Sequence, residues 1–309
     1  MTNLQIIRQL VISSFLLFIL GCTTATKQLD EKNNGSFSFV FMTDIHLQPE
    51  KNAVEGFNQA IDSVNKLNPD FVITGGDLVM DALGQNFERA EMLYGLYQKS
   101  LQRYKMPVYN TMGNHEIFGI YEESGVDKNH PEYGEKMYEN RIGQRYYSFD
   151  HKGWHFMILD AIGLTPERTY IGQIEEAQME WIRKDLSGLN PQTPIVISVH
   201  IPFITTYTQL SRGTMAASDA GTVITNGREV LSLFLPYNLK LVLQGHLHFL
   251  EDMYVDNQVH FITGGAVSGR WWQGPPSKNV EEGFLMVKAG DDRIDWTYVD
   301  YGWEAMPEE

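Results

Sequence analysis

The segment FSFVFMTDIH, residues 37–46, joins a β-prone run to two side chains that can bind a metal ion. Residues Phe37 to Met42 are largely apolar and rich in aromatic side chains, which favours a β-strand. Asp44 and His46 follow directly, and side chains two residues apart on an extended segment point the same way. Both can therefore reach one metal ion, although an Asp-x-His triplet by itself also occurs often by chance.

Strands and helices alternate from this segment onward. Apolar residues recur at spacings of three and four from Ala53 to Leu67 and predict a helix, which Asn68-Pro69 ends. The apolar run Phe71 to Thr74 predicts a second strand, residues 86–104 a second helix and residues 107–111 a third strand. This alternation predicts a central β-sheet with helices packed on it.

The remainder of the chain is predicted to add strands and two long connections. Residues 118–141 are rich in Glu, Asn, Gly and Tyr and predict an excursion over the surface, whereas residues 205–225 are a candidate active-site loop. We also expect a helix at residues 174–186 and strands at residues 145–149, 155–160, 194–199, 239–243, 259–263, 284–287 and 294–299. No repeat or low-complexity linker follows residue 36, so we expect one domain, residues 37–309.

Four further motifs of histidine, aspartate and asparagine follow in a fixed order, each directly after a predicted strand. They are Gly75-Gly76-Asp77, Gly113-Asn114-His115, His200 and Gly245-His246-Leu247-His248. Each alone has a plainer explanation, such as a turn or a structural histidine, but five such signals at strand ends are not expected to coincide. Active sites of α/β sheets gather beyond the carboxyl ends of the strands, where these motifs would lie. The ligand atoms suit Mn, Fe or Zn and suffice for two divalent metal ions that share one carboxylate.

The order of these motifs resembles the calcineurin-like metallophosphoesterase superfamily, over about Phe39 to His248. The resemblance implies an α/β fold, a sandwich of two central mixed β-sheets flanked by helices. It also implies a dinuclear metal centre that Asp77 bridges. By match to the family's motifs, the first ion would take Asp44, His46 and His248, and the second Asn114, His200 and His246.

The same resemblance implies hydrolysis of phosphate esters. A hydroxide that bridges the ions would attack phosphorus in line, and His115 would act as the general acid toward the leaving alkoxide. Met80 stands where serine/threonine phosphatases of the family carry an aspartate, so the next residue, Asp81, is our candidate partner for orienting His115. The iron-ligating tyrosine of purple acid phosphatases is absent, and a purple Fe(III) centre is not expected.

The segment from Gly264 to Pro276 is dense in glycine and aromatic residues and is predicted to line the pocket mouth. Arg270 could hold a phosphate oxygen, and Trp271 or Trp272 could stack on a base or sugar. The alternative is that the tryptophans pack in the core and that Arg270 is a surface ion-pair partner. Arg145 is a further candidate for the substrate.

The metal motifs leave the kind of substrate open. A small phosphorylated molecule is expected, and both a phosphomonoesterase or nucleotidase and a phosphodiesterase acting on a cyclic nucleotide or a phospholipid head group are compatible with them. A non-catalytic ligand-binding envelope lipoprotein is the competing class. It fits less well, because a pure binding module has no need of the full ligand set together with His115.

The composition is that of an ordinary globular protein, with 43% hydrophobic and 20% charged residues. The formal net charge of -15 disfavours nucleic-acid binding, because phosphate backbones require a basic surface. No feature of the sequence determines the oligomeric state.

The N-terminus resembles a bacterial lipoprotein signal peptide, residues 1–21. Arg8 precedes an apolar core, Leu10 to Leu20, which is too short for a typical membrane span. Cys22 follows it, is the only cysteine of the chain, and is our candidate for lipidation. Residues 22–36 would form a polar tether. We therefore expect a protein anchored by lipid in the bacterial cell envelope, and Thr23 favours the outer membrane or a periplasm-facing position in a Gram-negative source.

Overall fold

The first β-sheet contains the segment with which the fold begins. The computed structural model describes residues 35–291 and 293–305, and the predicted signal peptide, Cys22 and most of the predicted tether lie outside them. Its central strands β1 (Phe37–Met42), β2 (Phe71–Thr74) and β3 (Val108–Asn110) are parallel. Strands β12 (Gly283–Gly290) and β13 (Arg293–Asp300) complete the order β13-β12-β1-β2-β3 as an antiparallel pair beside β1.

The second sheet repeats this plan with six strands in the order β10-β11-β9-β8-β5-β4. The four inner strands are parallel and both edge strands are antiparallel to their neighbours. The strands are β4 (Tyr147–His151), β5 (Trp154–Ile158), β8 (Pro194–Ser198), β9 (Asn238–Gln244), β10 (Glu251–Val255) and β11 (Val259–Thr263). Parallel strands end at the same edge, so both sheets present their carboxyl ends to one side.

The two sheets pack face to face through an aromatic core. Side chains alternate along a strand, so Phe37, Phe39 and Phe41 of β1 point into this layer, whereas Val40 and Met42 point to the other face. The rings of Phe39 and Phe71 stack with centroids 5.1 Å apart and planes 6° apart. Such a pair stabilises the fold by about 0.5–1.5 kcal/mol beyond the buried area.

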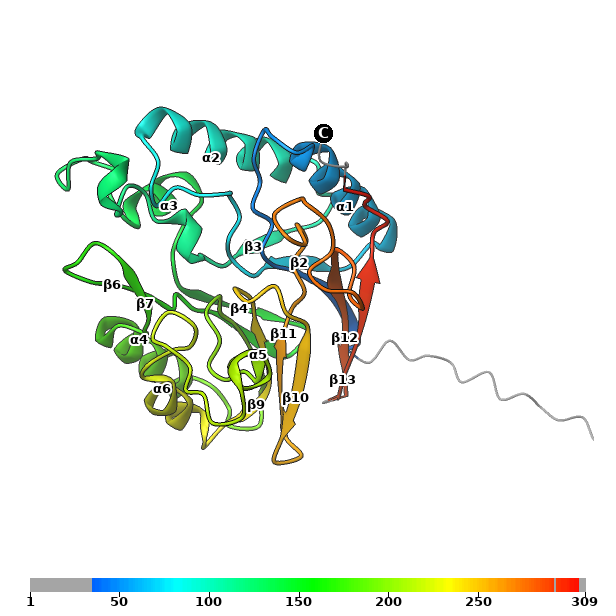
Figure 1. Ribbon diagram of the computed structural model, residues 1–309. Helices are drawn as coiled ribbons and strands as arrows, with labels where there is room; N and C mark the ends of the chain where they lie inside the picture. Colours follow the sequence, from blue (N-terminus) through cyan, green and yellow to red (C-terminus); the bar gives the residue numbers. More distant parts are fainter. Residues whose placement is uncertain (1–34, 292, 306–309) are drawn as a thin grey trace, which may run out of the picture. The chain divides into compact units, whose positions relative to one another are not determined.

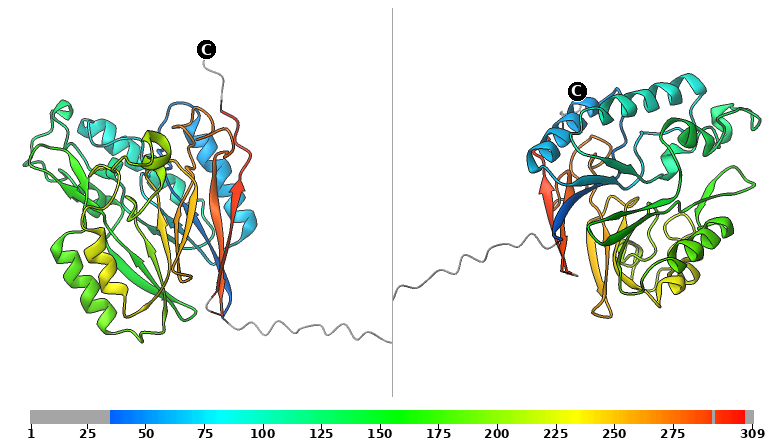
Figure 2. Two further views of the ribbon diagram at one scale, coloured as in Figure 1. Left: turned by 60° about the horizontal axis from the view of Figure 1, so that its bottom comes forward. Right: turned by 180° about the vertical axis from the view of Figure 1, so that it is seen from behind.

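Helices cover the outer faces of both sheets, which completes the predicted sandwich of two mixed sheets flanked by helices (Figure 1, Figure 2). Helices α1 (Ala53–Leu67), α2 (Phe87–Leu101) and α3 (Lys136–Arg141) lie beside the first sheet. Helices α4 (Glu176–Ser187) and α6 (Gly227–Phe234) pack together beside the second.

Local signals explain the ends of the two long helices. Asn68 adopts the left-handed conformation at the end of α1 and donates its backbone N–H to Val64, and the following Pro69 cannot continue the helix. At the start of α2, the Asn86 side chain accepts a hydrogen bond from the Arg89 backbone N–H. No helix of the described residues is both long and apolar enough to cross a lipid bilayer.

Several short elements were not expected from the sequence, because their apolar patterns are too brief to show a period. They are the hairpin β6 (Ile162–Leu164) and β7 (Tyr170–Gly172), strand β10, helices α3, α5 (Tyr207–Arg212) and α6, and the 3-10 turns η1 (Asn114–Glu116) and η2 (Glu122–Ser124). The expected surface excursion at residues 118–141 is wrong in part, since Met137 and Tyr138 are fully buried and Tyr138 donates its hydroxyl to the Asn110 carbonyl.

Replacing Phe39 by alanine should lower the free energy of unfolding by about 3–5 kcal/mol, because it opens a cavity between the two sheets. Phe39 is fully buried, whereas Leu235 is 82% exposed, so Leu235→Ala is the matched control and should change stability by no more than about 0.5 kcal/mol. Urea unfolding of the two variants checks this, and equal stabilities would contradict the assignment of the aromatic core.

Candidate metal centre

All five motifs meet at the carboxyl-terminal edge of the two sheets. The first sheet delivers those that follow β1, β2 and β3, and the second delivers those that follow β8 and β9. Eight side chains gather there: Asp44, His46, Asp77, Asn114, His115, His200, His246 and His248. Five of them are less than 9% exposed, and the other three, His115, His246 and His248, are partly accessible.

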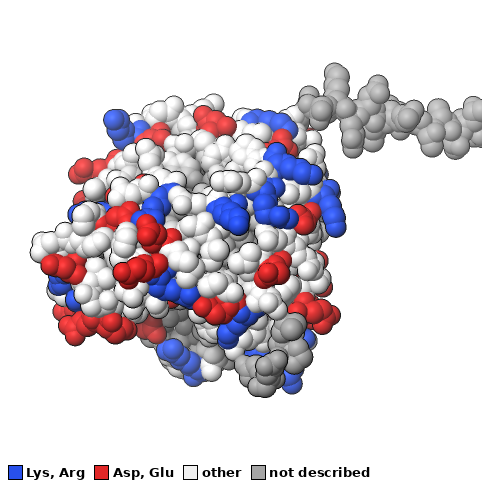
Figure 3. All heavy atoms as spheres, turned by 90° about the horizontal axis from the view of Figure 1, so that it is seen from above, with Lys and Arg blue, Asp and Glu red and all other residues white. Residues whose placement is uncertain are grey.

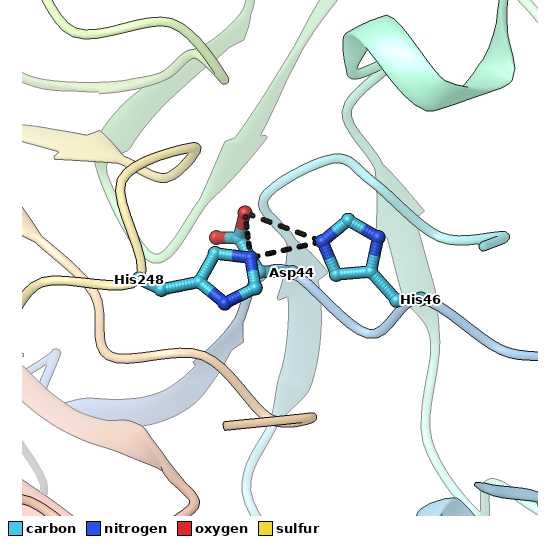
Figure 4. A group of neighbouring side chains, drawn as sticks. All are labelled: Asp44, His46 and His248. Atoms are coloured by element: carbon cyan, nitrogen blue, oxygen red, sulfur yellow. Dashed lines mark hydrogen bonds and ion pairs between the residues drawn. The ribbon is translucent and has the colours of Figure 1, made fainter. Parts of the chain in front are cut away.

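Asp44, His46 and His248 form the first group (Figure 4). The Nε2 atoms of His46 and His248 lie 2.9 Å apart, and Asp44 Oδ1 lies 3.9 Å from the first and 3.4 Å from the second. Two imidazole nitrogens and one carboxylate oxygen thus converge on a single point, although they come from chain segments about 200 residues apart.

Asp77, His200 and His246 form the second group, and Asn114 completes it. His200 Nε2 lies 3.1 Å from Asp77 Oδ2 and 3.2 Å from Asn114 Oδ1. The same Asp77 oxygen lies 3.6 Å from His46 Nε2 in the first group. Asp77 therefore stands between the two groups, where the sequence predicted a shared carboxylate.

Backbone carbonyls orient three of the histidines. His200 Nδ1 donates to Gly75, His248 Nδ1 to Gly269 and His246 Nε2 to Gly221, at 2.8, 2.5 and 3.0 Å. A carbonyl can only accept, so each bond places a proton on one ring nitrogen, and in the neutral ring the other nitrogen keeps its lone pair. For His246 that other atom, Nδ1, is buried without a hydrogen-bond partner. A buried nitrogen without a partner is unfavourable unless a metal ion binds it, so the donor set fits a metal.

In the second group, neighbouring side chains shift one another's pKa values. Burial opposes the charged form of Asp77, but His200, His115 and His46 hold the pKa of this carboxyl well below its usual range. Burial likewise disfavours charged His200, but Asp77 raises the pKa of His200 to about 9. Burial and the neighbouring His200 lower the pKa of His246 to about 3. His246 is therefore neutral at pH 7, which is the form that binds a metal.

The ligand loops have an unusual backbone. Five ligands adopt left-handed φ values, namely Asp44 at 56°, His46 at 47°, Asp77 at 51°, His246 at 74° and His248 at 48°. This conformation costs of order 1–3 kcal/mol for each residue and clusters at functional sites. The motif glycines are needed for close packing: a Cβ at Gly76, whose φ is +92°, would lie 2.5 Å from His200 Nδ1, and one at Gly245 would lie 2.1 Å from Thr43 Oγ1.

Glu116 braces the loop that carries Asp77. Its buried carboxylate accepts backbone N–H bonds from Asp77, Leu78, Val79 and Gly113 at 2.7–3.1 Å. Burial and the nearby Asp77 raise its pKa to about 7, against these hydrogen bonds. Sequence reasoning missed this residue; the available signal was a glutamate directly after Asn114-His115 and before the apolar pair Ile117-Phe118.

The partner of His115 differs from the predicted one. His115 Nδ1 donates to the Met80 carbonyl, which leaves Nε2 facing Asp77 Oδ2 at 3.8 Å. Asp81 instead accepts hydrogen bonds from the Leu83 backbone and the Gln85 side chain, so the prediction that Asp81 orients His115 is wrong. No sequence signal points to this contact, because Met80 lies 35 residues from His115 and every residue type provides a carbonyl acceptor.

The predicted substrate residues take different positions. Trp271 is 41% exposed and its ring lies 4.9 Å from that of His248 and 6.1 Å from that of His46, directly beside the first group. Trp272 is only 2% exposed and donates its indole N–H to the carbonyls of Ile45 and His46, so it supports the ligand loop and cannot stack on a substrate.

The two predicted arginines do not join the metal ligands. Arg145 pairs with Asp160, Glu135 and Glu139, so its charge is used within the structure and the predicted substrate role is not supported. Arg270 is exposed, donates to the Gln273 carbonyl at 3.4 Å and lines a separate acidic cavity with Glu281 and Glu282.

Two adjoining ligand groups with a common carboxylate, set at the carboxyl ends of two packed mixed sheets, define a dinuclear metal hydrolase. The family described as calcineurin-like phosphoesterase matches residues 37–250, and the chain belongs to it. It is a metal-dependent phosphoester hydrolase whose donor set is that of a centre for two divalent ions.

Solved structures show the same fold. A dimetal phosphatase from Danio rerio has a TM-score of 0.57 at 15% identity and covers 86% of this chain and 99% of its own. GAP50, the anchor in the inner membrane complex of Plasmodium, has a TM-score of 0.54 at 13% identity and covers 86% of this chain and 85% of its own. No curated protein sequence matches the chain.

Glu116→Gln should weaken Mn²⁺ binding by about 10–100-fold, because one amide oxygen cannot accept the four N–H bonds and the NH₂ group faces donors. Calorimetric titration of the metal-free protein with Mn²⁺ measures this. Glu122 is exposed on the next 3-10 turn, so Glu122→Gln makes the same chemical change and should bind Mn²⁺ as the wild type does. Unaltered affinity in Glu116→Gln would disprove the bracing role.

Proposed function

We propose that this protein hydrolyses small phosphate esters at the site where the two ligand groups share Asp77. In this proposal one ion is held by Asp44, His46 and His248, the other by Asn114, His200 and His246, and both by Asp77. The observation that carries the proposal is the convergence of these donors, with the partly exposed His115 beside them. The donor types favour Mn, Fe or Zn.

Ions bound in these groups would supply a hydroxide nucleophile at neutral pH and neutralise the phosphate oxygens. In the reaction a water oxygen forms a bond to phosphorus while the ester P–O bond breaks. Nδ1 of His115 keeps its proton on the Met80 carbonyl, so His115 would act as the general acid in its doubly protonated form, which gives the Nε2 proton to the leaving alkoxide. Asn114 contributes an amide oxygen, which adds no negative charge beside the phosphate.

His115→Ala should retain bound metal but lower kcat by about 10²–10⁴-fold, since proton donation to the leaving group is lost. Turnover of 4-nitrophenyl phosphate and of bis(4-nitrophenyl) phosphate with added Mn²⁺, together with metal analysis, measures both. His260 pairs with Asp252 away from the centre, so His260→Ala is the control and should keep full activity. Wild-type kcat in the His115 variant would rule out the acid role.

If the protein with both sites filled by Mn²⁺, Fe²⁺ or Zn²⁺ turned over neither ester, this proposal would be contradicted. Nucleic acid is not a proposed partner, because the net charge is -15 and acidic side chains stand among the basic ones on the face shown in Figure 3.

We also propose that Cys22 carries lipid and anchors the protein in a bacterial cell envelope. The support is in the sequence: an apolar core of 11 residues, Leu10 to Leu20, precedes the only cysteine, and a polar stretch separates that cysteine from β1. An acyl chain contributes about 0.8 kcal/mol of membrane binding for each buried methylene.

Cys22→Ser should therefore move the protein from the membrane fraction to the soluble fraction and abolish incorporation of labelled palmitate. Ser36→Ala, at the far end of the predicted tether, is the control and should remain in the membrane fraction. Membrane retention and labelling of the Cys22→Ser variant would refute the anchor without affecting the proposed reaction.

A further inference from the structure

The exposed ring of Trp271 lies beside the first ligand group. Its centroid is 4.9 Å from that of the His248 imidazole, with the planes tilted by 43°, and 6.1 Å from that of His46, with the planes at 62°. Trp271 is 41% exposed, whereas Asp44 and His46 are at most 1% exposed. The indole thus packs on two metal ligands and still leaves a large part of its surface open to solvent, where a molecule bound at the centre can reach it.

The backbone holds Trp271 in this place at a local cost. Its φ of 52° lies in the left-handed region, and so does the φ of 68° of the next residue, Trp272. Such values are unfavourable for bulky side chains and persist only where the surrounding structure imposes them. The position of the Trp271 ring is therefore imposed by the fold around it.

The residues on both sides of Trp271 bond to the loop that carries Asp44 and His46. Before it, Ser268 Oγ donates to the Asp44 carbonyl at 2.8 Å, and after it, Trp272 donates its indole N–H to the His46 carbonyl at 3.1 Å. A side chain that is held in place before binding loses little conformational entropy when a ligand packs on it. Trp271 is therefore a preorganised contact surface beside the first group.

The proton donor of the proposed reaction lies next to the same ligand. The rings of His46 and His115 pack edge-on with centroids 4.6 Å apart, so His46 contacts both His115 and Trp271. His115 gives its proton to the leaving oxygen in that reaction. The substituent on the leaving oxygen therefore belongs on the His46 side of the centre, where Trp271 offers it an exposed apolar surface.

The chemistry of this surface favours one kind of substituent. An indole face stacks well on a flat aromatic ring, and the loss of one such contact weakens binding by about tenfold. A quaternary ammonium is also attracted to an indole, but a divalent ion in the first group would repel a cation placed beside His248. A neutral planar ring is therefore the group that fits beside Trp271.

We propose that Trp271 determines the ester preference of this protein by stacking on an aromatic ring in the leaving group of a phosphate ester. This inference rests on the proposed function and names its substrate class. Water adds to phosphorus, the ester P–O bond breaks, and an alcohol or phenol that carries the ring departs with the proton from His115. Trp271 itself forms no bond in the reaction and acts only on specificity.

Phosphonates test the stacking contact by binding alone, because their P–C bond is not an ester. Trp271→Ala should lower the affinity of the Mn²⁺-loaded protein for phenylphosphonate by about tenfold more than its affinity for methylphosphonate in calorimetric titration. Mn²⁺ affinity, titrated separately, should not account for the loss.

Tyr254 provides the matched control for this titration. It is 53% exposed on the outer strand β10, and its ring stacks on that of His260 with centroids 4.2 Å apart. Tyr254→Ala therefore also removes an exposed aromatic ring from a histidine, but away from the metal centre. This variant should bind phenylphosphonate as the wild type does.

Two further substitutions separate stacking from support of the ligand His248. Trp271→Phe keeps a flat ring and should recover most of the phenylphosphonate affinity, whereas Trp271→Leu keeps apolar bulk without a ring and should not. Equal losses for phenylphosphonate and methylphosphonate in Trp271→Ala would overturn the proposal, since they would show a purely supporting role. A larger loss for 2-(trimethylammonio)ethylphosphonate than for phenylphosphonate would overturn it in favour of a cationic substituent.

Turnover is the second measurement. Phenyl phosphate and methyl phosphate each have a single substituent, which is the one that leaves. Trp271→Ala should lower kcat/KM for phenyl phosphate by about tenfold more than for methyl phosphate. Each ester is compared with itself in the two proteins, so the different acidities of the leaving groups cancel. If the wild type hydrolyses no phosphate ester, the proposed function fails, and the phosphonate titrations still decide the role of Trp271.

Discussion

One buried carboxylate organises the site. Asp77 lies between His200 and His46, accepts the backbone N–H of His115 and has a pKa well below its usual range because these histidines surround it. A buried carboxylate is unfavourable unless it is paired, so Asp77 draws histidines from both sheets toward one point. Asp77 belongs to the second group and its Oδ2 also lies 3.6 Å from His46 of the first, so the candidate metal centre lies at the junction of the two sheets.

The protein maintains this arrangement against a substantial local cost. Five ligands with left-handed backbone would each be unfavourable in an isolated peptide. Glu116 offsets part of that cost by accepting four N–H groups around the Asp77 loop, and Trp272 does the same beneath the His46 loop by donating to two carbonyls. The aromatic layer between the sheets supplies the rigid base on which these loops rest.

Different parts of the chain surround the centre and supply its ligands. The ligands follow strand ends, whereas the exposed Trp271 beside the first group comes from the connection between β11 and β12. Loops vary without loss of the sheets, so one metal centre can serve different esters through different loops. The choice of ester accordingly depends on residues outside the five motifs.

The sequence by itself determined where the strands end and which side chains gather at those ends. Motifs such as Asp44-x-His46 and His246-x-His248 place their ligands within three residues, and a short apolar run before each predicts the strand that positions it. Tertiary structure decided the partners: the Met80 carbonyl for His115, the Gly221 carbonyl for His246 and the core site of Trp272, whose indole bonds to residues 226 and 227 positions away. These contacts could not be predicted, because a backbone carbonyl is the same at every residue and only the folded chain selects which one lies within reach.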